Sequence, residues 1–468
     1  MTLDALRLEV AEISEQNADS LTDLSLQLAQ AREMPIESAL SRITRLLHRH
    51  NRSPMTLLER QRALQSFSDA FHHYSSQNSS QIRLGQAFIQ LCEELATGFK
   101  RLLLQILQSK HPSRPHLAWC LYMTLQFLAQ KMLRNHQLYQ EPHPNLWRDS
   151  HIIYWLGEHQ QCLDDPIAAA FVPTPADTLR GLYQQMLLAA LSNPFHLAEN
   201  QCLELFSALA PLAQHAALLP WEREDEPSGP TIDLTESQPY LTLTQTPEGS
   251  VEYLRRFELG ALLIALQEPS PLQSSKEHAL LQEVQQHWLG RQQRRHQRLE
   301  HEQSCHLVAG LQAIHAQLLE QRPMKIPGLI QDASPGGARL LCSAEQKTKI
   351  SVGQLVILLT DSVIPTLALV RWRHINAEGM HFGLRYLKGL PKPIWLRRTP
   401  SAQTHPGILQ STPAQDSAWH HGLWLPTGQF VEGENVWLQM NNMHHQKILP
   451  LPTANLETVC VTRYPVVL

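Results

Sequence analysis

Residues 1 to about 220 place apolar side chains at the three- and four-residue spacing of amphipathic helices. Proline clusters such as HPSRP, EPHPN and FVPTPAD interrupt this pattern, as expected where helices end. We therefore predict an all-α domain over 1–220 with about seven or eight helices. The spacing is clearest in ESALSRITRLLHRH (37–50), IRLGQAFIQLCEELATGFKRLLLQILQ (82–108) and LAWCLYMTLQFLAQKMLRNHQLY (117–139).

The character of the chain changes over residues 221–290, which we interpret as a connector. Its first part, WEREDEPSGPTIDLTESQPYLTLTQTPEGS, is rich in proline, acids and threonine, and YLTLTQ is a candidate strand of a hairpin. Two helices are predicted after it, around VEYLRRFELGALLIALQ and SSKEHALLQEVQQHW. Ser274 or Ser275 is the candidate N-cap of the second helix.

After residue 304 the pattern becomes that of short β-strands separated by Gly, Pro, Asp and Ser. The candidate strands HLVAGL, ARLLCS, QLVILLT, TLALVRWR and MHFGLRYL predict a barrel or a sandwich over 291–395. A smaller β module is predicted over 396–468 from GLWLPTGQFVEGENVWLQM and TVCVTRYPVVL. The stretch RTPSAQTHPGILQSTPAQDSA, rich in proline and serine, is expected to separate the two. The fold class is thus multidomain α + β.

Composition narrows the classes of function. The 468 residues exceed one ordinary core, and 43% hydrophobic with 18% charged residues is typical of globular domains. A net charge of −4 disfavours a general nucleic-acid binder but leaves room for one small basic pocket. The N-terminus lacks a signal-peptide pattern, and no stretch reaches the length of a membrane span. These features favour a bacterial cytoplasmic protein.

Motifs for metal binding or catalysis are missing from the sequence. The seven cysteines include no CxxC pair, and the 25 histidines are dispersed. HExxxH at 301–306 is one residue longer than the zinc-protease motif. No GxxxxGK[ST], GxGxxG or GxSxG occurs. We therefore expect no metal, no cofactor and no enzymatic activity, and we interpret tryptophans such as Trp372 as core or pocket-edge residues.

Two motifs remain, and their chemistry suits a small dianionic purine ligand. Arginine forks pair with phosphate oxygens and with the O6/N7 edge of guanine, and they stack on purines. A carboxylate accepts hydrogen bonds from guanine N1–H and N2, and glycines let the backbone approach the ligand. The first motif is RxxxR, present twice through Arg291, Arg294, Arg295 and Arg298; the second is DxSxxG, formed by Asp332, Ser334, Gly336 and Gly337.

Each motif also has a plain structural interpretation. An arginine run suits the C-terminal end of a helix, where its charge interacts favourably with the helix dipole. The segment from Asp332 to Gly337 suits a hairpin turn with Asx chemistry. Both interpretations are compatible with binding, since a turn can also form the wall of a pocket.

In this order the two motifs resemble those of the PilZ family of cyclic di-GMP receptors. The strands that follow fit the family too, including the G-x-x-F-like strand with Gly383 and Tyr386. The resemblance covers roughly residues 290–390 and implies a six-stranded antiparallel barrel. It implies that Arg294 and Arg298, or Arg291 and Arg295, clamp the ligand opposite Asp332, Ser334 and Gly337. Asp332 lies 34 positions after Arg298, a longer spacing than is usual, and AIHAQLLEQRPMKIP is the expected insertion.

The resemblance implies a cyclic di-GMP receptor or effector. We expect the ligand to pin the arginine run against the barrel and so change the hinge to the helical domain, which would contact a protein partner. We favour Arg294 and Arg298 because Arg298 lies eight residues before His306, the first strand residue expected. The rival from another class is a protein-interaction scaffold with a degenerate barrel that binds no dinucleotide.

Overall fold

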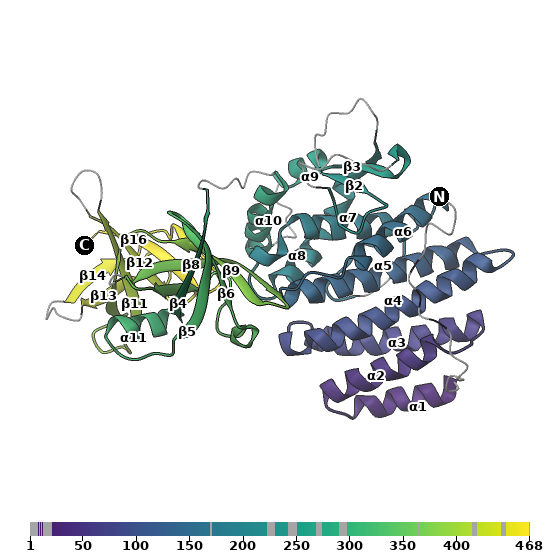
Figure 1. Ribbon diagram of the computed structural model, residues 1–468, viewed down its shortest axis with the longest axis horizontal. Coiled ribbons are helices and arrows are strands. Elements are labelled where there is room, and N and C mark those ends of the chain that lie inside the picture. Colours follow the sequence, from purple (N-terminus) through teal and green to yellow (C-terminus); the bar gives the residue numbers. More distant parts are fainter. Residues whose placement is uncertain are drawn as a thin grey trace. The chain divides into compact units, whose positions relative to one another are not determined.

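The chain forms two compact units in a computed structural model. Unit 1 comprises Met1–Pro194 and Asn200–Gln292, and unit 2 comprises Phe195–Glu199 and Gln293–Leu468. Helices dominate the first unit and antiparallel strands the second, which confirms the multidomain α + β fold class (Figure 1). The residues that the structure describes are 8, 10, 12, 21–168, 171–221, 230–241, 250–267, 274–289, 297–362, 365–413, 419–440 and 446–467.

Unit 1 is built mainly from helices that pack side by side along the chain order (Figure 1). Among the described residues, none of these helices has the length and apolar composition to cross a bilayer. The helices are α1 (Leu21–Arg32), α2 (Ile36–Asn51), α3 (Leu57–Asn78), α4 (Gly85–Gln108), α5 (Arg114–Gln137), α6 (Asn145–His159), α7 (Leu179–Leu191), α8 (Gln201–Leu209), α9 (Gly260–Ala265) and α10 (Ser275–Trp288).

Local sequence explains where two of these helices begin. The Thr56 hydroxyl accepts a hydrogen bond from the Glu59 backbone N–H, and the Glu59 carboxylate accepts one from the Thr56 backbone N–H. Ser274 and Glu277 make the same reciprocal capping box at the start of α10. Such boxes satisfy backbone donors that a helix leaves unpaired. Of the two predicted N-caps for α10, Ser274 is the one used.

A three-stranded antiparallel sheet in the order β1-β3-β2 joins the end of the predicted helical domain to the predicted connector. Its strands are β1 (Ala217–Pro220), β2 (Thr231–Asp233) and β3 (Leu254–Glu258). Strand β3 occupies the first part of VEYLRRFELGALLIALQ, which was predicted to be helical, so only the later part of that segment forms an α-helix, α9. The predicted strand YLTLTQ contributes one isolated bridge between Leu241 and Thr231, and its remaining residues from 242 onward lie outside the described part of the chain. The sheet therefore uses an earlier segment, TID, in which all three residues are buried.

Unit 2 contains a closed barrel of six antiparallel strands, as predicted, and the strands follow the order β4-β5-β6-β9-β8-β7. Buried apolar side chains that alternate along the strands fill its interior, among them Leu307, Ile330, Leu340, Val370 and Phe382. The strands are β4 (Leu299–Ala309), β5 (Ile326–Ser334), β6 (Gly337–Cys342), β7 (Leu355–Leu359), β8 (Thr366–Asn376) and β9 (Gly379–Tyr386). The predicted insertion after the first strand is present as helix α11 (Leu311–Leu318).

A seven-stranded sheet follows the barrel, in the order β14-β13-β10-β11-β12-β16-β15. The predicted boundary at residue 395 falls inside β10, and the stretch expected to separate two modules contributes β11, in which Ile408 and Leu409 are buried. Burial of these two side chains outweighs the turn-like composition around them. The strands are β10 (Leu390–Arg397), β11 (His405–Pro413), β12 (Trp419–Pro426), β13 (Asn435–Met440), β14 (Gln446–Pro450), β15 (Leu456–Glu457) and β16 (Val461–Val466).

The barrel and this sheet share an apolar cluster. Leu355, Leu367 and Leu369 of the barrel belong to the same buried cluster as Ile408 and Trp424 of the sheet. Helix α11 contributes Leu311 and Ile314 to that cluster. One side of the barrel wall is therefore covered by other parts of unit 2. The polar side chains considered below lie on another part of the barrel's outer surface.

Replacing Trp424 with Ala tests this packing. Trp424 is fully buried, and its indole N–H donates to Gln410 Oε1 at 2.8 Å. The lost apolar burial and the cavity should lower the free energy of unfolding of unit 2 by about 3–5 kcal/mol. Urea unfolding measures this change, with Val431→Ala, at a side chain 63% exposed, as the control expected to stay within about 0.5 kcal/mol. Equal losses in the two variants would contradict the shared core.

Candidate functional site

The described residues of the two sequence motifs lie at one end of the barrel. Arg298 directly precedes β4, whereas Asp332 and Ser334 lie at the end of β5. Gly336 belongs to the turn that joins β5 to β6, and Gly337 is the first residue of β6. Arg291, Arg294 and Arg295 lie outside the described residues.

Arg298 and Asp332 are in direct contact. Arg298 Nη1 donates to Asp332 Oδ1 at 2.8 Å, the length of a charge-assisted hydrogen bond. The side chains are 23% and 19% exposed, so the pair is partly shielded from water and still within reach of a ligand. Strand pairing brings them together, because Leu299, the residue after Arg298, pairs with Ala333.

The turn after Asp332 is held by short-range contacts. Gly336 N–H donates to Ser334 Oγ at 3.4 Å, and the Ser334 hydroxyl donates to Gly337 O at 3.3 Å. Tyr386 N–H donates to Gly336 O at 3.0 Å, which ties the turn to β9. A side chain at Gly337 would collide with the Leu384 carbonyl, so β6 and β9 can approach this closely only with glycine there.

Strand register assembles a second set of side chains beside the motif residues. Asp332 pairs with Arg339, Arg339 with Gly383, and Gly383 with Trp372. We call these four positions the transverse row; it spans roughly 14 Å at the usual spacing of neighbouring strands. The flanking residues Ala338 and Leu384 pack into the barrel interior, so alternation directs the row to the outer face.

Two β-bulges determine which face of the barrel the two end residues of this row reach. The pairing of β5 with β6 shifts between Ile330 and Asp332, and that of β8 with β9 shifts between Val370 and Trp372. A bulge inserts one extra residue and changes which face the following side chains reach. Asp332 and Trp372 each come directly after such a shift.

Gly383 determines where the indole of Trp372 lies. A side chain at Gly383 would collide with Nε1 and neighbouring ring atoms of Trp372. The indole therefore lies directly over the backbone of β9, in the space that a side chain would fill. The arrangement presents an aromatic group beside Arg339 on the outer face of the barrel.

The same face carries an excess of cationic groups. Arg385 pairs in register with Gly337, and the nearby Arg371 lowers the pKa of Arg385 in addition to the larger effect of burial. No carboxylate of the described residues forms an ion pair with Arg371 or Arg385. Arg339 Nη2 lies 3.3 Å from His381 Nδ1, and burial followed by the charge of Arg339 lowers the pKa of His381. Among the described residues, the guanidinium groups of Arg371 and Arg385 therefore have no carboxylate as an ion-pair partner.

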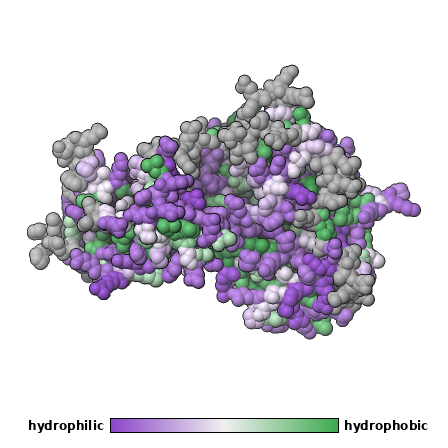
Figure 2. Space-filling view, in the orientation of Figure 1, coloured by the Kyte–Doolittle hydropathy of each residue, from purple (hydrophilic) through white to green (hydrophobic). Residues whose placement is uncertain are grey.

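The outer face can bind an anion that also carries a flat base. Guanidinium groups suit phosphate, the Asp332 carboxylate suits base N–H donors, and the indole offers a surface for stacking. Figure 2 shows mainly hydrophilic residues in the region of β8 and β9 on the side turned to the viewer. No group of His, Cys, Asp and Glu with the geometry of a metal site occurs among the described residues.

The sequence motifs identified only part of this face. Arg339, Arg371 and Arg385 carried no signal of their own, because their relation to Asp332 depends on cross-strand register. Trp372 was interpreted only as core or pocket edge, and Gly383 only as part of a family-like strand. Arg339 lies opposite Gly383 because β6 pairs with β9, and β7 and β8 lie between these two strands in the chain, so no turn in the sequence indicates the pairing.

Comparison with known proteins finds a family match in the helical unit, not in the barrel. Residues 20–224 match the family described as "Cyclic-di-GMP receptor FimW, N-terminal domain". The match covers less than half of the chain and lies in the helical region, whereas the sequence motifs had placed the receptor resemblance in roughly residues 290–390. No curated protein and no solved structure matches the chain.

Replacing Gly383 with Ala tests the placement of the indole. The added methyl group would force Trp372 away from β9, and such overpacking should lower the free energy of unfolding by about 1–3 kcal/mol. The indole N–H resonance of Trp372, assigned by its loss in Trp372→Phe, should move in the Gly383→Ala spectrum. Gly260→Ala is the control, since a side chain there meets no atom within 4 Å. An unmoved resonance would mean that Trp372 does not lie over Gly383.

Proposed function

We propose that this protein is a receptor for cyclic di-GMP and that the dinucleotide binds to the outer face of the barrel around Arg298 and Asp332. One observation carries the proposal: the Arg298–Asp332 ion pair, at 2.8 Å, joins two motifs that lie thirty-four residues apart. The match of residues 20–224 to a cyclic di-GMP receptor family supports it independently.

The ion pair prepares both partners for a guanine nucleotide. A guanidinium has five N–H donors, and a carboxylate has about four acceptor positions, so each can hold the other and still bind a ligand. Arg298 would contact a phosphate or the O6/N7 edge of guanine, while Asp332 would accept from N1–H and N2. Holding them together before binding reduces the conformational entropy that binding would otherwise cost.

Residues around the pair complete the proposed site. Ser334, Gly336 and Gly337 form the turn that follows Asp332, and Gly337 lets this turn lie close against β9. Arg385 adds positive charge for the phosphates, and Trp372 gives a purine a surface to stack on. This is a binding function with no chemical step, and it requires no cofactor.

The position of the arginine segment suggests how binding reaches the helical unit. The chain passes from unit 1 to unit 2 at Gln292 and Gln293, inside the run that contains Arg291 to Arg298. A dianion held by this segment and by the barrel would restrict the connection between the units. The effect can be no larger than the ligand's preference for the restricted state. We propose that the helical unit passes this change to a protein partner.

Calorimetric titration of the full chain with cyclic di-GMP tests the site. Arg298→Ala and Asp332→Ala should each weaken binding roughly 10- to 100-fold, the cost of losing a hydrogen bond to a charged group. Arg298→Ala should have the larger effect, because it also leaves the Asp332 carboxylate unpaired beside the phosphates.

Arg322→Ala is the matched control for these variants. Arg322 is exposed and precedes β5, whereas Asp332 and Ser334 lie near the end of that strand. Its affinity should equal that of the wild type. Unchanged affinity in both Arg298→Ala and Asp332→Ala would refute the site, and no binding heat in the wild type would favour the scaffold alternative.

The choice between the two RxxxR registers is a separate prediction. If Arg294 and Arg298 act together, Arg294→Ala should weaken binding as much as Arg298→Ala does. Arg291→Ala and Arg295→Ala should change the affinity by less than about threefold, as for exposed charges near a site. The same titrations measure all four variants, and the reverse order of effects would assign the clamp to Arg291 and Arg295.

A further inference from the structure

Among the described residues, one buried cation of unit 1 differs from the other buried lysines and arginines in its hydrogen bonding. Six lysine and arginine side chains of the described residues are buried. Five of them donate hydrogen bonds to carboxylates, carbonyls or side-chain amides, as buried charges generally must. These five are Arg60, Lys100, Arg134, Arg255 and Arg373, and the sixth is Arg101.

Arg101 lies on α4 with 7% of its surface exposed. Its Nε is fully buried and has no hydrogen-bond partner among the described residues. The preceding residue shows the contrast, since Lys100 Nζ donates to Asp149 Oδ2 at 2.7 Å. Leaving a buried guanidinium N–H without an acceptor is costly, so the unpaired Nε of Arg101 indicates that an acceptor is supplied from elsewhere.

The charges around Arg101 have the same sign. Burial and then the charge of Arg52 lower the pKa of Arg101. Burial and then the charge of Arg101 lower the pKa of Arg60 to about 10. Three guanidinium groups from α4, α3 and the end of α2 therefore lie near one another.

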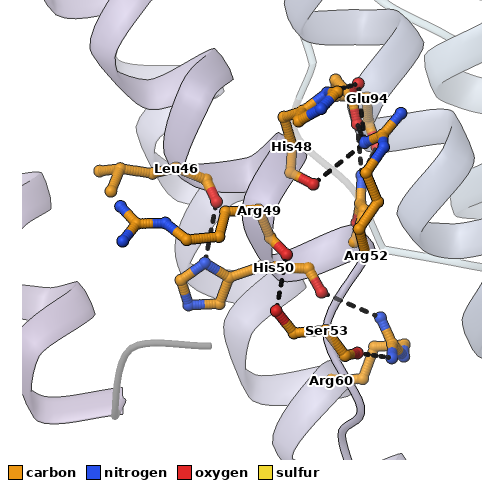
Figure 3. A network of polar contacts seen from close by, with 9 residues as sticks. Leu46, His48, Arg49, His50, Arg52, Ser53, Arg60 and Glu94 are labelled. Atoms are coloured by element: carbon orange, nitrogen blue, oxygen red, sulfur yellow. Dashed lines mark hydrogen bonds and ion pairs between the residues drawn. The ribbon is translucent and has the colours of Figure 1, made fainter. Parts of the chain in front are cut away.

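The carboxylate beside them is already engaged. Glu94 accepts from His48 Nδ1 at 2.8 Å, from Asn51 Nδ2 at 2.8 Å and from Arg52 Nη1 at 3.0 Å (Figure 3). These contacts hold Arg52 in place and use the acceptor positions of Glu94. Among the described residues named here, one carboxylate lies beside three guanidinium groups, which gives this set a net positive charge.

Arg60 is fixed as well, below Arg52 in the same view. Its Nη1 and Nη2 donate to the carbonyls of His50 and Ser53 at 3.4 and 3.1 Å, where α2 ends (Figure 3). Its Nε donates to Gln105 Oε1 at 3.1 Å. Gly98, one turn before Arg101, lets α4 approach α3 closely, because a side chain at Gly98 would collide with Leu64 of α3. The cluster is therefore built on packed helices with its neighbouring side chains already positioned.

We propose that Arg101, together with Arg52, binds a phosphate group in unit 1, at a site separate from the dinucleotide site of the barrel. A guanidinium fork pairs with phosphate oxygens through parallel hydrogen bonds, and a second guanidinium stabilises the remaining charge. Because only 7% of Arg101 is exposed, we infer that the occupant is a small ion, or one phosphate at the end of a slender ligand, rather than the surface of a folded partner. Free phosphate and a nucleoside monophosphate share this chemistry.

Thermal unfolding of the full chain, followed by far-ultraviolet circular dichroism, tests the proposal in potassium phosphate and in potassium chloride of equal ionic strength. Phosphate stabilises most proteins to some degree, so the difference between variants is the readout. For each protein the readout is the unfolding midpoint in phosphate minus the midpoint in chloride. This difference should be about 2–4 °C larger for the wild type than for Arg101→Gln. The control Arg45→Gln, at an exposed arginine of α2, should behave like the wild type.

Arg101→Gln should also unfold at the same temperature as the wild type or higher in chloride, because it removes a buried charge without a partner. Equal phosphate responses in the wild type and Arg101→Gln would overturn the proposal, as would a clearly lower midpoint of Arg101→Gln in chloride. Broadening of the ³¹P resonance of inorganic phosphate by the wild type, lost in Arg101→Gln, supports direct binding. A larger midpoint shift with guanosine 5′-monophosphate than with inorganic phosphate, seen in the wild type and lost in Arg101→Gln, identifies a nucleotide as the source.

Discussion

The closed hydrogen-bond register of the barrel is the constraint on which the proposed dinucleotide site depends. Apolar residues such as Leu340 and Phe382 must face inward, and the two-residue alternation of strands then sends Arg339 and Gly383 outward together. A slip of one residue between β6 and β9 would pair Arg339 with Phe382 or Leu384, which would either bury the arginine or expose its apolar partner. The energy of the apolar interior therefore specifies the geometry of polar groups that make little contact with it.

Bulges and glycines, in addition to the strand register, determine where the Asp332 and Trp372 side chains lie. Without the shift after Ile330, Asp332 would face the interior rather than Arg298. Without a bare backbone at Gly383, Trp372 would lie elsewhere. These features weaken the barrel locally, since bulges interrupt its ladder and glycine contributes no packing. Their cost is tolerable because the apolar cluster shared with the C-terminal sheet stabilises the opposite wall of the same barrel.

Sequence reasoning succeeded where the signal was local. Helical periodicity, the Ser274 cap and the alternation of β8 and β9 are each contained within about ten to twenty residues. The DxSxxG turn could be located because its chemistry lies within one hairpin. Strand β11 was missed because its turn-like residues conceal two core side chains, and the role of Arg385 was missed because it depends on pairing with Gly337. The unpaired state of Arg101 could not be foreseen, since it arises from helices that meet only in the folded unit.

The distribution of charge favours a small anion over a long polyanion at both proposed sites. A polymer with one negative charge every few ångströms needs a broad positive surface, and this chain carries a net charge of −4. Local groups of guanidinium around Asp332 and around Glu94 instead produce a positive field over a few side chains, with carboxylates placed among them. These local charges act within a Debye length of about 8 Å, so the distant charges of an extended polyanion are screened from them and gain little from the site. The carboxylate beside each arginine group thus has two effects, since it orients a guanidinium and limits binding to ligands small enough to meet the cations alone.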